Sequence, residues 1–171
     1  MNCTENLDAL IERLNQVFNL IKPLLVSGDP AIDGPFLQEL ETLNEAQNDF
    51  IRYHWGHMQM QLEAAKTEYF DSLNLATIGY IKRTENGLDE FVKAHANGTS
   101  VNQKWLDTER KSMSDQLSRK MTDADTWFDL KVAAVESRFR SEFDAVFLGV
   151  HESAMKIVSR YEDAMNGSNK N

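Results

Sequence analysis

Apolar residues recur every eleven positions through the C-terminal part of the chain, between Val101 and Met165. The pattern consists of three columns: Leu117, Phe128, Phe139, Val150 and Tyr161; Met121, Val132, Phe143, Ala154 and Met165; and Ala124, Val135, Val146 and Ile157. Eleven residues over three turns correspond to about 3.67 residues per turn, close to the pitch of a straight α-helix. The pattern therefore stays on one face and predicts a long helix over residues 101–165 with a continuous apolar seam.

The same spacing appears earlier in the chain, directly after Pro35. Its columns hold Phe36, Gln47, Met58, Tyr69, Tyr80 and Phe91; Leu40, Ile51, Leu62 and Leu73; and Leu43, His54, Ala65 and Ala76. Asn and Gly are residues at which helices commonly stop, and the third column reaches Asn86-Gly87. We expect a helix over residues 35–84, a break near 84–87 and a short helical continuation over 88–95.

A shorter N-terminal helix is predicted for residues 4–26. Apolar side chains step by four and three residues there, at Leu7, Ile11, Leu14, Phe18, Ile21 and Leu25. Thr4 is a suitable N-cap residue, and Pro23 should kink or end the last turn. Residues 27–35 contain glycine and proline at several positions and form the turn to the next helix.

Residues 96–100 (ANGTS) form the loop between the two long helices, with Ser100 as a candidate cap of the last helix. Because so short a loop reverses the chain, residue i should lie opposite residue about 196 − i. His54 should then lie near Glu142 and Phe143. The sequence predicts a single all-α domain over residues 1–171: an elongated, coiled-coil-like antiparallel helical hairpin, with the N-terminal helix packed at the end away from this loop.

Several apolar seam residues near the loop lie beyond the reach of the short N-terminal helix. These interface candidates are Tyr69, Leu73, Tyr80, Trp105, Met113 and Leu117. Each large apolar side chain left in water costs about 1.5–3 kcal/mol, so we expect these residues to be covered by a partner. A homodimer or larger homo-oligomer that completes a four-helix bundle is the simplest solution, and a heterologous helical protein satisfies the same requirement. Gln47 and His54, the polar seam residues, are candidates for fixing the register of pairing.

Composition narrows the classes of partner. A net charge of −9 repels nucleic-acid phosphates and anionic lipid headgroups, so we expect no nucleic-acid binding. No uncharged apolar run is long enough to span a membrane. Cys3 is the only cysteine, and the acidic N-terminus does not resemble a secretory signal. We therefore expect a cytoplasmic or otherwise intracellular protein.

The sequence contains no motif that indicates catalysis or a cofactor. We find no glycine-rich phosphate loop, no nucleophile elbow and no Cys/His metal pattern. His54 and His57 are three residues apart and share one side of a helix, which leaves a metal site open as an alternative. The Glu-x-x-His motif of di-iron bundles is missing, so we predict neither an enzyme nor a cofactor.

Three functional hypotheses follow. The leading one is a non-enzymatic structural or protein-interaction protein that self-associates or assembles with partner proteins. The second is an amphipathic helix protein of the membrane surface, because eleven-residue periodicity also suits helices that lie flat on lipid. The third is a helical-bundle sensor domain that binds a metal or small ligand through His54.

Overall fold

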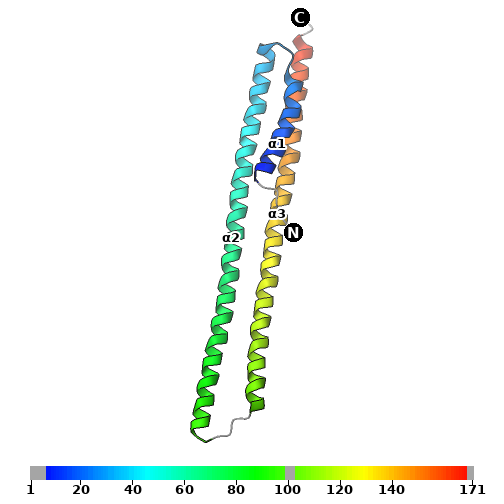
Figure 1. The fold of residues 1–171 in the computed structure, drawn as a ribbon. Coiled ribbons are helices and arrows are strands. Elements are labelled where there is room, and N and C mark those ends of the chain that lie inside the picture. The colour runs from blue at the N-terminus through cyan, green and yellow to red at the C-terminus, as the bar shows by residue number, and fades with distance from the viewer. Residues whose placement is uncertain (1–6, 99–102, 169–171) are drawn as a thin grey trace. The chain divides into compact units, whose positions relative to one another are not determined.

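The computed structural model describes residues 7–98 and 103–168. Within them the chain forms α1 (Leu7–Ile21), the short 3-10 helix η1 (Lys22–Leu25), α2 (Pro30–Ala96) and α3 (Gln103–Ser168), and no strand (Figure 1). Helices α2 and α3 pack against each other as an antiparallel hairpin, which confirms the predicted fold class. The predicted caps at Thr4 and Ser100 lie outside the described residues.

Two compact units make up the described chain. The first, which we call the three-helix unit, contains α1, η1, residues 30–60 of α2 and residues 135–168 of α3. The second, the two-helix unit, contains residues 61–98 and 103–134. A single domain over residues 1–171 stays a prediction.

The first helix ends as its proline predicts. Helix α1 stops at Ile21, and the last turn continues as 3-10 helix η1, which has Pro23 at its start. Gly28 follows with a φ of 94°, a left-handed conformation that glycine adopts without strain.

Helix α2 begins earlier than predicted, at Pro30 rather than near residue 35. Asp29 acts as the N-cap: its Oδ1 accepts a hydrogen bond of 2.9 Å from the Ala31 N–H. Pro30 occupies the first helical position, where its missing N–H has no helical partner to lose. The predicted start was wrong because Asp29-Pro30 supplies the same signal as Asp33-Gly34-Pro35 one turn sooner.

The predicted break near residues 84–87, and with it a separate helix over 88–95, is also wrong. Helix α2 continues through Asn86-Gly87, and Gly87 has no positive φ. Glycine inside a helix costs only about 1 kcal/mol relative to alanine, so the seam residues on either side outweigh it. Helix α2 ends at Ala96, and Gly98 adopts the left-handed conformation with a φ of 71°.

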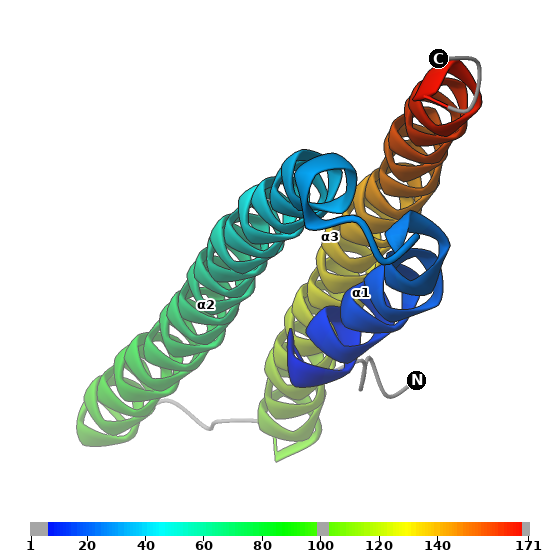
Figure 2. The same cartoon turned by 90° about the horizontal axis from the view of Figure 1, so that it is seen from above.

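The three-helix unit has a conventional core. Its largest fully buried side chains are Phe139, Leu10, Leu14, Leu25, Ile51 and Val150. Helix α1 lies beside α3 (Figure 2), where the Arg13 guanidinium sits 4.2 Å from the centre of the Phe147 ring. Helix α1 therefore packs as the sequence predicts, against the parts of α2 and α3 that are most distant in sequence from the 96–100 loop.

The two-helix unit buries far less. Among its described residues the buried apolar side chains are two alanines, Ala65 and Ala76. The larger seam residues, including Tyr69 and Phe128, stay half-buried, although their rings contact each other at 4.9 Å between centroids. Two helices alone shield this seam incompletely.

The predicted register is confirmed in both units. In the three-helix unit, His54 Nδ1 lies 3.3 Å from Glu142 Oε2. In the two-helix unit, the Tyr69 hydroxyl donates a 2.6 Å hydrogen bond to Asp125 Oδ1. Both pairs lie at or next to the expected pairing of residue i with residue about 196 − i. The register holds because the break that would have shifted it does not occur.

Candidate functional site

His54 and Glu142 form a contact across α2 and α3 in the three-helix unit. Both side chains are half-buried, and the two facing atoms, His54 Nδ1 and Glu142 Oε2, are shielded from solvent. The two atoms are 3.3 Å apart, a close polar contact without the geometry of a well-aligned hydrogen bond. The His54 ring also stacks on Phe50, with 4.0 Å between ring centres.

Arg138 completes this cluster from one turn earlier on α3. Its Nε donates a 2.9 Å hydrogen bond to Glu142 Oε1. This bond lowers the pKa of the Glu142 carboxyl, burial opposes the change, and His54 lowers the pKa further. Glu142 therefore stays ionised and offers His54 a negative partner, so the cluster is well suited to link the helices at one register.

The cluster does not have the composition of a metal site. Among the described residues, no group of three or more His, Cys, Asp or Glu side chains is placed to hold a metal ion. His57, the other histidine of the metal hypothesis, is half-buried with its ring 6.1 Å from that of Phe139. Gln47, the second candidate for fixing register, is also half-buried.

The interface candidates near the loop all belong to the two-helix unit. Five of the six candidates are half-buried: Tyr69, Leu73, Tyr80, Met113 and Leu117. Trp105 is 50% exposed. The hydrogen bond to Asp125, followed by partial burial, raises the pKa of Tyr69. The structure thus brings the half-buried residues to the α2–α3 seam, where they cover one another only in part.

A second apolar surface in this unit was missed by the sequence analysis. It runs along α2, and its residues are 48% to 61% exposed: Phe70, Ile78, Ile81, Leu88 and Val92. We call this set the α2 stripe. A signal was available, because Phe70, Ile81 and Val92 are spaced by eleven and each follows a residue of the first seam column. This column was overlooked because the prediction considered only the residues of the seam.

A buried carboxylate in the three-helix unit was also missed. Asp33 is only 6% exposed, and it accepts hydrogen bonds from the Ser27 hydroxyl (2.7 Å), the Gly28 N–H (3.0 Å) and the Tyr161 hydroxyl (2.9 Å). Burial would raise the pKa of Asp33, but these bonds and that of the Ser27 N–H outweigh it and lower the pKa from 3.8 to about 2. Asp33 thus links the 27–29 turn, α2 and α3. These hydrogen bonds give its carboxylate a structural role.

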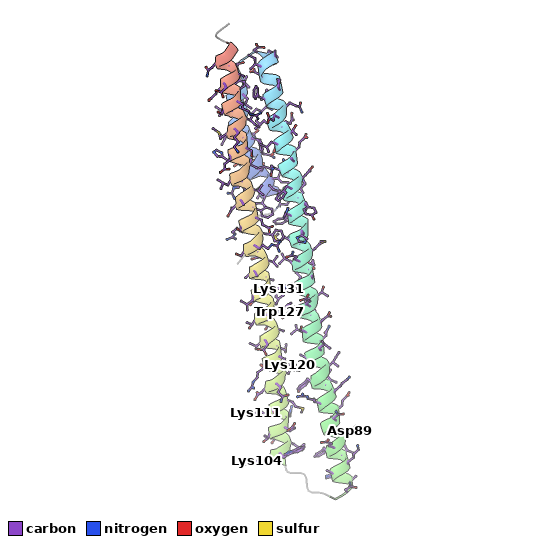
Figure 3. All side chains as sticks on the ribbon, turned by 180° about the vertical axis from the view of Figure 1, so that it is seen from behind. Asp89, Lys104, Lys111, Lys120, Trp127 and Lys131 are labelled. Atoms are coloured by element: carbon purple, nitrogen blue, oxygen red, sulfur yellow. The ribbon has the colours of Figure 1, made fainter. Side chains whose placement is uncertain are left out.

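The α3 side of the two-helix unit is mixed in character. Figure 3 labels four exposed lysines along it, Lys104, Lys111, Lys120 and Lys131, and Trp127, whose ring lies 5.9 Å from the Lys131 ammonium. Acidic residues alternate with these lysines in the sequence, so the charges do not form a patch of one sign. No helix in the described part of the chain is long and apolar enough to cross a membrane.

One solvent-open groove of about 710 Å³ lies between α2 and α3 in the three-helix unit. Its walls include Leu43, Ala46 and Ile157, and the Arg160–Glu39 ion pair at 2.5 Å lies beside them. These side chains are typical of an ordinary surface between two packed helices.

Searches against protein-family models, curated proteins and solved structures found nothing that matches this chain.

Proposed function

We propose that this chain is a non-enzymatic helical interaction protein that self-associates through its two-helix unit. The simplest assembly is a two-fold dimer in which two copies of this unit form a four-helix bundle. This proposal is supported by the chemistry of the surface: the most prominent feature of the unit is unshielded apolar side chains on helices.

One observation carries the proposal: the two-helix unit leaves its large apolar residues in contact with water. Its buried apolar side chains are Ala65 and Ala76, while the α2 stripe and Trp105 stay about half-exposed or more. At about 25 cal/mol per Å², covering half of a large side chain stabilises an assembly by roughly 1 kcal/mol. Several such residues together favour association strongly enough to offset part of its entropic cost.

The membrane-surface hypothesis has weaker support. A lipid surface would also cover apolar side chains, but a net charge of −9 is repelled by anionic headgroups. An intracellular, reducing location agrees with the single cysteine and stays a prediction.

Sedimentation equilibrium or light scattering coupled to size exclusion tests the proposal. We expect a mass of at least twice the 19.6 kDa of one chain at micromolar concentration, falling toward the monomer mass on dilution. A monomer throughout the concentration range up to several hundred micromolar would refute self-association.

A further inference from the structure

We infer that the α2 stripe is the docking surface for the α2 stripe of a second copy, with the two α2 helices antiparallel about Ile81. This inference rests on the proposed self-association and specifies which face and which orientation carry it.

The position of the stripe on α2 suits a bundle. Phe70, Ile81 and Val92 each follow a seam residue, namely Tyr69, Tyr80 and Phe91 in turn. One residue step is a rotation of about 100° around a helix, so the stripe lies roughly a quarter turn from the seam that faces α3. Two α2–α3 pairs joined through their stripes would therefore place four helices near the corners of a square, as in a four-helix bundle.

The three-helix unit shows that this register position accepts a helix. Leu37 precedes Phe70 by thirty-three residues, which is three repeats of eleven, so the two residues occupy equivalent positions on α2. Leu37 is half-buried, and it lines a small cleft together with Phe18 and Lys22 of the α1–η1 segment. At Leu37, the α1–η1 segment thus lies beside the helix position that Phe70, Ile81 and Val92 expose in the two-helix unit.

The three stripe residues that are spaced by eleven are symmetric about the middle one, Ile81. Phe70 and Val92 lie at equal distances in sequence on either side of Ile81. A two-fold axis at Ile81 would therefore pack Phe70 against the partner's Val92, and Ile81 against the partner's Ile81. The stretch from Phe70 to Val92 corresponds to about 33 Å of helix, enough for several turns of contact.

Charge favours the antiparallel orientation over the parallel one. Asp71 and Lys93 are exposed, and each follows a stripe residue, so they flank opposite ends of the stripe. Antiparallel pairing brings Asp71 toward the partner's Lys93 at both ends of the contact. Lys82, which follows Ile81 in the same way, lies near the partner's Lys82 in either orientation and does not discriminate between them. Parallel pairing would place Asp71 near the partner's Asp71 and Lys93 near the partner's Lys93, and such like-charge contacts disfavour an interface.

A matched pair of charge substitutions tests the surface. Ile81→Glu places a carboxylate at the centre of the stripe, whereas Leu75→Glu places one at a more exposed apolar residue about 120–140° away around α2. We expect Ile81→Glu to weaken self-association at least tenfold, with helicity by circular dichroism unchanged, and Leu75→Glu to leave it unchanged. If the unmodified chain dimerises and Ile81→Glu dimerises equally well, the stripe is not the interface, although self-association stands. A monomeric unmodified chain would overturn both proposals.

Disulfide cross-linking tests the orientation. In a Cys3→Ser background, an Ile81→Cys chain should form a cross-linked dimer under mild oxidation, because the two-fold axis brings its copies together. In a mixture of separately labelled Phe70→Cys and Val92→Cys chains, we expect the mixed dimer to exceed both like-with-like dimers. An excess of like-with-like dimers would show parallel pairing and overturn the antiparallel inference.

Discussion

The three-helix and two-helix units contain the same eleven-residue seam, yet they bury it to different extents. Phe139 in the three-helix unit is 1% exposed, whereas Phe128, one repeat earlier on the same helix face, is half-buried. The difference is α1, which adds Leu10, Leu14 and Phe18 to one core and has no counterpart among the described residues of the other unit. An apolar pattern therefore predicts which face is buried, but the number of helices around it decides how deeply.

The largest expected effect comes from truncating equivalent phenylalanines in the two units. Phe139→Ala should lower the free energy of unfolding by about 3–5 kcal/mol, because it opens a cavity in a filled core. Phe128→Ala, measured at a concentration where the chain is monomeric, should cost less than half as much, because solvent already reaches that ring. Urea unfolding followed by circular dichroism provides both values. Equal losses would show that the two units are packed alike.

The next effect concerns Asp33, whose folded-state pKa is lowered to about 2. Because the pKa of Asp33 is lower in the folded chain than its ordinary value of 3.8, its ionised carboxylate stabilises the fold at pH values above about 4. This stabilisation is lost as the pH falls from about 4 to about 2. Asp33→Asn should therefore lower the melting temperature most at neutral pH, and its difference from the unmodified chain should narrow through that acid range. Thermal melts at a series of pH values measure this. A difference that does not change with pH would rule out the ionised carboxylate as its source.

A glycine substitution should strengthen the two-helix unit. Gly87 lies inside α2 without a positive φ, and a Cβ added there meets no atom within 4 Å. Gly87→Ala should raise stability by about 0.5–1 kcal/mol through helix propensity. Hydrogen exchange of the amides in residues 80–96 should slow accordingly.

Gly98 provides the matched control for that substitution. It too has open space at the Cβ position, but its φ of 71° strains any other residue. Gly98→Ala should therefore destabilise the chain by about 1 kcal/mol. If both alanines act in the same direction, backbone conformation does not explain the effect at Gly87.

An effect no larger than that at Gly87 is expected in the half-buried cluster of Arg138, Glu142 and His54 in the three-helix unit. Glu142→Gln removes the charge that faces His54 and Arg138, and should cost about 0.5–1 kcal/mol. The cost should shrink in high salt, where such contacts are screened. Chemical unfolding at two salt concentrations checks this, with Glu152→Gln, at an exposed residue of the same helix, as the control.

Much of the fold could be predicted because its signals are repetitive. The repeated apolar columns correctly predicted two long helices, and the short loop around Gly98 correctly predicted the register that joins His54 to Glu142. The two wrong predictions, the break in α2 and its first residue, both concern short sequence signals that compete with neighbouring ones. Asn86-Gly87 is a stop signal that the surrounding helix overrides, and Asp29-Pro30 precedes a second start signal of the same kind.

The candidate site was predicted only in part, for a different reason. Tyr69, Leu73 and Tyr80 were recognised because they continue the seam, but the α2 stripe beside them was not. Periodicity shows which residues share a face of one helix, whereas exposure depends on which other helices cover that face. The bond between Asp33 and Tyr161 could likewise not be predicted, since it joins residues that are 128 positions apart in the chain.

A seam that repeats every eleven residues permits sliding: α3 shifted by one repeat along α2 would again match apolar side chains to apolar side chains. Asp33 removes this ambiguity, because a shift of one repeat would bring Val150 in place of Tyr161 and take from the buried carboxylate the hydrogen bond that reaches it from α3. One tyrosine hydroxyl thus distinguishes the native alignment of α2 and α3 from the alignment shifted by eleven residues. The apolar side chains alone do not distinguish the two.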